Sequence, residues 1–326
     1  MTNDPARGRI IGSSSADIAA AARQLLAGDI IGLPTETVYG LAADATQGEA
    51  VATLYEAKGR PAFNPLISHV SDLAMAMEHG VFNRVAQKLA EAFWPGPLTL
   101  VVPFQTGSGV SDLARAGLDS IGLRVPAHPV AKALIAAVGR PLAAPSANRS
   151  GQISPTSAQD VIAELGRRVS VVIDGGSCPV GVESTIIACL NGQLVQLRPG
   201  GIPHNALEAI AGSPITRNLP PGPLRAPGML ASHYAPIAPL RMNAVTFNPD
   251  DAILAFGPCD TSLLPQASPW INLSPTGDLR QAAARLFSAL RELDSHKPGA
   301  IAVMPIPASG LGEAINDRLS RAAAPR

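Results

Sequence analysis

The sequence predicts an α/β protein: an open, twisted, mixed sheet with helices, followed by a smaller Rossmann-like α/β domain. Three observations predict this class. Short apolar runs of strand length alternate with segments whose apolar residues recur at helical spacing. The 326 residues are 46% hydrophobic, which is enough for about two domains with cores of their own. A proline-rich segment at 213–240 separates two stretches that each alternate strand and helix patterns.

The first part begins with a helix that Ser14 or Ser15 can cap and that continues to Gly28. A strand at 30–33 follows, and the next helix ends at Lys58, because the glycine after it permits a left-handed stop. Helical patterns lie between several of the later apolar runs. Those runs predict strands at 66–70, 98–104, 121–125, 142–144, 169–173, 185–190 and 194–197.

The second part follows a segment whose many prolines exclude a helix or a central strand. We expect this segment to be a semi-rigid linker that reaches back across the first domain. After it, the patterns predict a strand at 252–256, a helix at 278–293, a strand at 300–304 and a helix from Glu313. The predicted organisation is a domain over 1–212, a linker over 213–240 and a domain over 241–326.

Charge, cysteines and missing motifs exclude several classes of function. The 25 basic residues balance 25 acidic ones, so we do not expect a protein that holds nucleic acid through many phosphate contacts. Cys178, Cys189 and Cys259 form no CxxC pair and are predicted to be small core residues in a reducing compartment. No stretch resembles a signal peptide or a membrane span, which predicts a soluble, cytoplasmic protein. Phosphate loops, GxGxxG and Cys/His metal spacings are absent, so no protein metal site is expected.

Polar residues gather at the ends of the apolar strands, where open α/β sheets place their ligand crevices. Lys58 lies at a helix C-terminus, a place that favours a cation without any ligand. Arg60 stands in a proline-stiffened loop, and its guanidinium suits phosphate oxygens. Arg124 lies within an apolar strand, so it either pairs with a carboxylate of the fold or awaits one from a ligand.

Four further segments at strand ends carry hydroxyl, amide or guanidinium groups. Segment 34–40, with two threonines and a glutamate, fits a capped turn and a binding rim equally well. Segment 144–151 offers donors that can wrap phosphate or sugar oxygens. Segments 183–185 and 197–200 add a serine, a threonine and a strand-end arginine.

Seven motifs, taken together and in order, resemble the YrdC/Sua5 family: PTETVYGL, KGRPAFNPLISHV, WPGPLTLVV, GLRVPAHP, PSANRSG, ESTII and LRPGGI. The resemblance runs from about Gly28 to Gly201, and PGM at 227–229 with HYAP at 233–236 resembles the linker of the two-domain Sua5 branch. It implies a YrdC-like catalytic domain and a Sua5-type C-terminal domain. The implied activity joins L-threonine, bicarbonate or CO2, and ATP into threonylcarbamoyl-AMP and pyrophosphate, for the N6-threonylcarbamoyladenosine of tRNAs that read ANN codons.

The same resemblance implies roles for individual residues. Lys58 and Arg60 would be catalytic, Mg²⁺ would accompany ATP, and no organic cofactor would be needed. The linker would act as a lid, and the product would pass to a downstream tRNA threonylcarbamoyl transferase complex, with at most weak tRNA contact and no membrane partner. L-Threonine would contact Thr37, His69, Arg124, Ala144 and Ser184. ATP would contact Arg60, Asn64, Ser120, Ser146, Asn148, Ser154, Arg198, Tyr234 and Ile237.

Two positions depart from the family pattern. Segment 230–232 lacks the basic and aromatic residues often found there, and Ala188 stands where an aspartate commonly follows ESTII. Two other functions remain open at this point. A non-enzymatic RNA-binding module conflicts with the neutral net charge, and an enzyme that uses carbamoyl phosphate would be expected to carry zinc-finger and acylphosphatase segments, which are missing.

Overall fold

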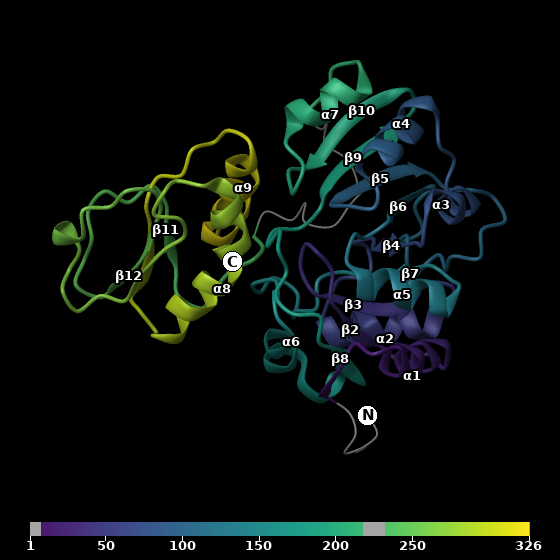
Figure 1. Cartoon of the computed structure of the whole chain (residues 1–326), viewed down its shortest axis with the longest axis horizontal. Helices are drawn as coiled ribbons and strands as arrows, with labels where there is room; N and C mark the ends of the chain where they lie inside the picture. Colours follow the sequence, from purple (N-terminus) through teal and green to yellow (C-terminus); the bar gives the residue numbers. More distant parts are fainter. Residues whose placement is uncertain (1–7, 218–231, 326) are drawn as a thin grey trace.

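The computed structural model describes residues 8–217 and 232–325 and forms two sheets (Figure 1). The larger sheet has ten strands within the described residues, in the order β1-β8-β2-β3-β7-β4-β6-β5-β9-β10. These strands are β1 (Arg9–Ile11), β2 (Ile31–Leu33), β3 (Gly40–Asp44), β4 (Ile67–His69), β5 (Leu98–Pro103), β6 (Ser120–Arg124), β7 (Leu142–Ala143), β8 (Val171–Ile173), β9 (Thr185–Leu190) and β10 (Gln193–Arg198).

The larger sheet is mixed, as the sequence predicts. Strand β4 is parallel to β6, whereas β5 pairs with β6 antiparallel and with β9 parallel. Its helices are α1 (Ser15–Leu26), α2 (Gly48–Lys58), α3 (Leu73–His79), α4 (Arg84–Phe93), α5 (Pro129–Val138), α6 (Ala158–Leu165) and α7 (His204–Ala211), with a 3-10 turn at Gly166–Arg168. Helices cover both faces of this sheet (Figure 1).

Helix boundaries follow local signals in the sequence. Ser14 caps α1, and its side chain forms a reciprocal capping box with Asp17. Helix α2 ends at Gly59, whose φ of 59° is the left-handed conformation expected of that glycine. Both predicted boundaries are therefore confirmed.

Separate apolar clusters cover the two faces of the larger sheet. In β3, Leu41 and Ala43 join the cluster that includes α2 and α4, whereas Ala42 between them joins the cluster under α1 and α5. This alternation is the period-2 pattern of a strand that is buried on both faces. Two of the three cysteines, Cys178 and Cys189, are buried core residues as predicted.

The smaller sheet has four parallel strands in the order β11-β14-β12-β13, which are β11 (Leu240–Arg241), β12 (Asp251–Ala255), β13 (Trp270–Asn272) and β14 (Ala300–Val303). Helices α8 (Leu279–Ser295) and α9 (Leu311–Ala323) accompany it, with a 3-10 turn at Thr261–Leu263. This parallel α/β unit confirms the predicted Rossmann-like second domain. Cys259 lies here, only half-buried, with its thiol 4.0 Å from the sulfur of Met304.

Four strands escape the sequence patterns: β1, β3, β11 and β13. Strand β3 reads GLAAD, a composition with little intrinsic preference for strands, and its hydrogen bonds to β2 and β7 define it. The other three are two or three residues long. Pairing with distant neighbours, rather than local composition, therefore creates these elements.

The two units share an apolar cluster and face one another through α8 and α9 (Figure 1). Val38, Ile153 and Val182 of the first unit pack in the same cluster as residues of α8 and α9. Helix α7 ends at Ala211, Thr216 still bridges to Val195, and the chain is described again from residue 232. Half of the predicted linker, including its PGM signature and Leu230-Ala231, lies outside the described residues.

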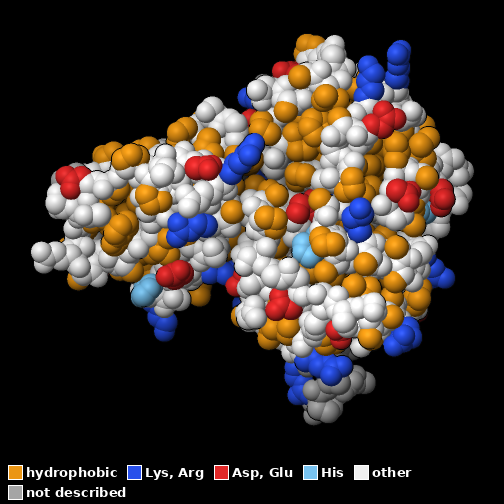
Figure 2. Space-filling view, in the orientation of Figure 1, with side chains coloured by type: hydrophobic (Ala, Val, Ile, Leu, Met, Phe, Trp, Pro, Cys, Tyr) orange, Lys and Arg blue, Asp and Glu red, His pale blue; other side chains and the backbone are white. Residues whose placement is uncertain are grey.

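No helix within residues 8–217 and 232–325 combines the length and apolar character needed to cross a membrane. Acidic and basic side chains are interspersed over the face shown in Figure 2, without one large basic field. That surface agrees with the balanced charge of the sequence.

Candidate active site

A cavity of about 40 Å³ lies where the motif-bearing strands end, between the larger sheet and the second unit. Strands β4 and β6 run parallel, so His69 and Arg124 are register partners at the same edge of the sheet. The lining residues are Thr37, Val38, Arg60, Ile67, His69, Arg124, Ala144, Pro145, Ser146, Glu183, Ser184, Arg198, His233 and Tyr234. Most of the residues predicted to hold threonine or ATP thus meet around one cavity.

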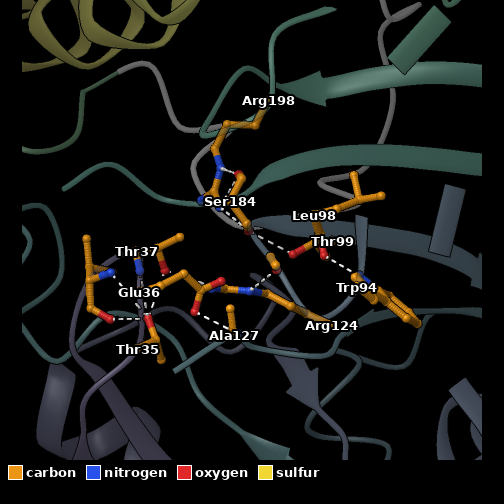
Figure 3. Close-up of polar contacts among 12 residues, drawn as sticks. Thr35, Glu36, Thr37, Trp94, Leu98, Thr99, Arg124, Ala127, Ser184 and Arg198 are labelled. Carbon is orange, nitrogen blue, oxygen red and sulfur yellow. Dashed lines mark hydrogen bonds and ion pairs between the residues drawn. The ribbon is translucent and has the colours of Figure 1, made fainter. Parts of the chain in front are cut away.

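Arg124 is held on one side of this cavity by a buried carboxylate (Figure 3). Its Nη2 lies 2.6 Å from Oε1 of Glu36, its Nη1 donates to the Thr37 hydroxyl at 3.0 Å, and its Nε donates to the Gly96 carbonyl. The other carboxylate oxygen of Glu36 accepts from the backbone N–H of Ala127. A guanidinium has five N–H donors, so Arg124 is fixed in orientation and still has donors for a ligand.

Arg198 and Ser184 form a second fixed pair across the cavity (Figure 3). The arginine donates through Nε and Nη2 to the Ser184 carbonyl at 3.1 and 2.9 Å, and Nη2 also lies 3.1 Å from the serine hydroxyl. The Ser184 hydroxyl is 2.8 Å from that of Thr99 on β5. Because β5 and β9 are parallel neighbours, the sheet itself sets this serine at the cavity wall.

Arg60 reaches the cavity from the loop after α2. Its Nε and Nη2 donate to the carbonyls of Asn64 and Pro65 at 3.2 and 3.0 Å, so the loop curls around its own arginine. Burial lowers the pKa of Arg60 to about 10, which leaves the group charged at neutral pH. Three guanidinium groups thus face one small space, an arrangement suited to phosphate and carboxylate oxygens.

Two histidines at the cavity are held neutral. Burial, with the nearby Arg124 cation, lowers the pKa of His69 to about 3, and its Nδ1 has no hydrogen-bond partner among the described residues. Burial and the cations of Arg60, Lys58 and Arg198 likewise lower the pKa of His233 to about 3. A neutral imidazole beside arginines can accept or donate one hydrogen bond to a ligand without adding charge.

Tyr234 closes the cavity from the side of the second unit. It is buried, it adopts a positive φ of 64°, and its ring stacks on Phe287 of α8 with centroids 5.7 Å apart. Its neighbour along the chain, Ala235, donates its N–H to the carbonyl of Gly151 in the first unit. The described end of the predicted lid therefore lies against the motif loops.

Six predicted site residues do not line the cavity: Lys58, Asn64, Ser120, Asn148, Ser154 and Ile237. Four of them support its walls. Lys58 is fully buried, and its Nζ donates to the carbonyls of Ser146 and Asn148, which ties α2 to the loop at 145–151. The Asn148 amide donates to the carbonyls of Arg149 and Gln152, and the Ser154 hydroxyl donates to Glu183 at 2.5 Å. Asn64 supplies the backbone carbonyl that Arg60 uses.

Ser120 and Ile237 lie elsewhere. Ser120 begins β6, about 13 Å along an extended strand from Arg124. Ile237 is 83% exposed and does not line the cavity, and its backbone N–H donates to Asp294 of α8. The placement of these two residues gives no support to their predicted ATP contacts, which remain predictions.

The sequence analysis did not predict three charged groups that shape the site. These are the carboxylate of Glu36, which pairs with Arg124, and the buried pair of Glu183 and Arg318. The first had a signal, because a lone arginine in an apolar strand requires a carboxylate and Glu36 stands in a neighbouring motif. The Arg318 contact had none, because it joins residues 135 positions apart. Within the described ranges, no group of three or more His, Cys, Asp or Glu side chains is arranged to hold a metal ion.

Two family models match the chain. The Sua5/YciO/YrdC model, described as "Telomere recombination", matches residues 23–200. A model described as "Threonylcarbamoyl-AMP synthase, C-terminal domain" matches residues 202–324. The two matches adjoin and together span both sheets.

Similar proteins cover nine tenths or more of the chain. The threonylcarbamoyl-AMP synthase of Bacillus subtilis (strain 168) is 38% identical, over 100% of this chain and 95% of its own. That of Pyrococcus abyssi (strain GE5 / Orsay) is 36% identical, over 90% of each. A crystal structure of P. abyssi Sua5 complexed with L-threonine matches with a TM-score of 0.85 at 34% identity, over 96% of this chain and 97% of that one. The similarity therefore includes the arrangement of both units around the cavity.

Proposed function

The chain belongs to the Sua5/YrdC family, and on that premise we propose that it joins L-threonine, bicarbonate or CO2, and ATP into threonylcarbamoyl-AMP and pyrophosphate. It is a threonylcarbamoyl-AMP synthase, as the relatives that match it over 90 to 100% of its length are named. The observation that carries the chemistry is the convergence of Arg60, Arg124 and Arg198 on one cavity, each already oriented by protein oxygens.

Threonine is proposed to bind on the Arg124 side of the cavity. The donors of Arg124 that Glu36 and Thr37 leave available would face the threonine carboxylate. His69, Ala144 and Ser184 also line the cavity and offer an imidazole, a small apolar surface and a hydroxyl. A neutral His69 suits the neighbourhood of an amine that must react as a nucleophile toward CO2, since it adds no competing positive charge.

ATP is proposed to bind with its phosphates toward Arg60 and Arg198. An oxygen of the carbamate attacks the α-phosphorus, the bond to the bridging oxygen breaks, and pyrophosphate leaves with the electron pair. Negative charge spreads over the phosphoryl oxygens in that step, and fixed guanidinium groups stabilise it without reorganisation. Ser146 is placed to add a hydroxyl, and Lys58 holds the loop that carries it.

Tyr234 and His233 are proposed to exclude water from this reaction. A carbamate and a mixed anhydride are both open to hydrolysis, so a cover over the cavity protects them. Both side chains are buried at the cavity, and their rings contact at 4.0 Å.

Mg²⁺ is proposed to accompany ATP. Glu183 is the carboxylate in the cavity lining, and it is committed to Ser154 and Arg318. The ion would therefore be held by phosphate oxygens and water rather than by a protein carboxylate cage, as is common for Mg²⁺ bound with a nucleotide. Its chemistry would be charge neutralisation at the phosphates.

The product is proposed to supply a transferase complex that makes N6-threonylcarbamoyladenosine on tRNAs reading ANN codons. An acyl adenylate is an activated donor and must be consumed by a group-transfer reaction. Because ATP and tRNA meet there, the cytoplasm is the proposed compartment.

The deciding experiment measures pyrophosphate release from ATP by the purified full chain with Mg²⁺ and bicarbonate. We expect release that depends on both L-threonine and bicarbonate, and little with serine or without an amino acid. Release only with carbamoyl phosphate would instead assign a carbamoyl-adenylate enzyme. No release under any condition, with tight salt-dependent tRNA binding, would assign an RNA-binding module.

Arg60 offers a direct test of the phosphate side. Arg60→Ala is expected to lower kcat/KM by about 100-fold or more, because it removes a fixed cation at the developing charge. Arg140→Ala is the matched control, since Arg140 is half-exposed and pairs with Asp44 away from the cavity. Equal activity of the two variants would contradict the assignment of Arg60.

A further inference from the structure

Arg318 of α9 is a fully buried arginine that crosses from the second unit to the wall of the cavity. Its side chain is 0% exposed, and its Nε lies 2.6 Å from Oε2 of Glu183 in the first unit. Its Nη2 donates to the carbonyl of Pro199 at 2.9 Å, and Nη1 pairs with Asp317 at 2.5 Å. All three nitrogens of the guanidinium are therefore engaged, two of them with the first unit.

Glu183 transmits this contact to the substrate-facing residues. It lines the cavity, and its other oxygen accepts from Ser154 at 2.5 Å. The next residue, Ser184, is the hydrogen-bond partner of Arg198. Pro199 directly follows Arg198 in the sequence, so Arg318 contacts the side chain of the residue before Ser184 and the backbone of the residue after Arg198.

Arg318 also contacts the aromatic residue that closes the cavity. Its guanidinium lies 5.2 Å from the ring centroid of Tyr234, within the range of a cation–π contact. Tyr234 stacks on Phe287 and lines the cavity. One side chain of α9 thus contacts both the catalytic sheet and the segment that closes it.

We propose that Arg318 is a positioning residue for the synthase reaction, through which the C-terminal domain holds Glu183, the Arg198 turn and Tyr234 in one arrangement. This inference rests on the proposed function. It gives the second domain a defined role in catalysis, because one guanidinium of that domain contacts the residues that orient the substrate-binding side chains.

The physical reason is that a buried carboxylate needs a partner. Without Arg318, Glu183 keeps the Ser154 hydroxyl as its direct hydrogen-bond partner and the nearby charge of Arg198. A buried carboxylate that has lost its paired cation is expected to move or take up a proton. Tyr234 would lose the cation over its ring at the same time. Either change displaces groups that contact substrate, and small displacements of reacting groups reduce rate strongly.

A matched control exists at the same interface. Arg291 of α8 also crosses between the units: its Nη1 lies 3.0 Å from Glu164, and its Nη2 donates to the Ile153 carbonyl. It does not line the cavity and contacts no lining residue through these bonds. Loss of Arg291 therefore weakens the interface without disturbing the site.

The first test compares Arg318→Met, Arg318→Lys and Arg291→Met in the full chain by threonine-dependent pyrophosphate release. We expect Arg318→Met to lose about 100-fold in kcat, with a smaller change in the KM for threonine. Arg318→Lys should recover part of this loss, because it restores charge but not the planar fork. Arg291→Met should stay within about threefold of wild type. Wild-type kcat in Arg318→Met, or an equal loss in both Met variants, would overturn the proposal.

The second test does not depend on activity. The N–H of His233 donates to Arg321, and that of Ala235 donates to Gly151, so hydrogen exchange at these amides reports how firmly the closing segment is held. Arg318→Met should speed their exchange about tenfold or more relative to Arg291→Met. Unchanged exchange in Arg318→Met would count against the positioning role of Arg318, whether or not the wild-type enzyme turns over. Absence of turnover in the wild-type enzyme would by itself refute only the proposed function.

A folding defect in Arg318→Met would shift the decision to Glu183→Gln, which keeps size and removes the charge. It should reproduce the loss of kcat, and the Arg318→Lys/Glu183→Gln double variant should lose no more than the larger single loss, as expected for two changes in one contact. Additive losses would refute a shared mechanism.

Discussion

Three guanidinium groups at the cavity are oriented by protein oxygens before any substrate arrives. Arg124 shows how this is done: the carboxylate of Glu36, the hydroxyl of Thr37 and the carbonyl of Gly96 each take one nitrogen. A buried cation of this kind is tolerated because it is paired, and it is useful because its remaining donors point in a fixed direction.

Glu36→Gln tests that pairing. The amide can still accept a hydrogen bond but no longer balances the charge, so we expect the KM for threonine to rise about tenfold and the unfolding free energy to fall by about 3 kcal/mol. Steady-state kinetics and urea unfolding measure the two effects. Glu313→Gln is the control, since Glu313 pairs with the exposed Arg217. A KM unchanged in Glu36→Gln would show that Arg124 needs no carboxylate.

The buried histidines predict how stability depends on pH. The pKa of His69 and that of His233 are each lowered to about 3, so between pH 6.5 and 3 the unfolded chain binds protons that the folded chain does not. Stability is therefore full above pH 6.5 and falls as the pH drops. Burial alone would raise the pKa of Glu183, but Arg318, Arg198 and Ser154 lower it to about 2, and its contribution is lost in the same direction.

We expect the unfolding free energy to fall by up to about 2 kcal/mol per buried histidine between pH 7 and pH 5. Urea unfolding at pH 5, 6 and 7 measures the slope. His69→Gln should flatten it, and His296→Gln, at an exposed position, should not. A slope of zero in the wild type would mean that neither histidine is held neutral.

At the scale of elements, the sequence predicts helix boundaries and the positions of polar clusters at strand ends, because local residues determine both. His69 and Arg124 end two parallel strands that are neighbours in the sheet, so motifs far apart in sequence meet at one edge. The prediction that polar clusters at strand ends share a crevice holds for that reason. At 34–40, β3 is a strand without a sequence signal, and the turn before it places Thr37 at the cavity. A binding role for this turn stays a prediction.

What escaped prediction depends on long-range packing. Lys58 points to the loop at 145–151 instead of the cavity because α2 docks there, and no local pattern encodes that choice. In the sequence, Arg318 is an ordinary charged residue of an amphipathic helix. Only the packing of the second unit against the first buries it against Glu183. Such contacts are settled by tertiary arrangement, which strand and helix periodicity do not describe.

The close approach of α8 to the loop before β9 gives a test at this scale. Gly181 has a φ of 72°, and a Cβ there would lie 2.3 Å from the Ala283 carbonyl oxygen and 2.4 Å from the Ala284 Cα. Gly181→Ala should therefore push α8 away and reduce kcat at least about tenfold. Gly192→Ala is the control, with a φ of 73° and no atom within 4 Å of the added Cβ. If both variants behave alike, backbone strain and not domain contact is responsible.

At the scale of the molecule, the two units are joined by an apolar cluster and by buried charges. Removal of residues after Ser213 takes away Arg318 and uncovers Val38, Ile153 and Val182. We expect the remaining domain to stay folded, because its two-sided core lies within its own sheet, but to lose about 100-fold or more in activity. Circular dichroism and pyrophosphate release measure these outcomes. Full turnover by the shortened chain would show that the second domain is dispensable.

The distribution of cysteines has a use in spectroscopy. Burial raises the pKa of Cys178 and that of Cys189 to about 12, so both thiols resist alkylation in the folded protein, whereas Cys259 in the second unit is half-buried. A maleimide dye should attach at that single position in the unmodified sequence. Trp94 lies in the first unit, so energy transfer from its indole to a dye at Cys259 would report the separation of the two units during turnover, once the contribution of Trp270 is removed by substitution.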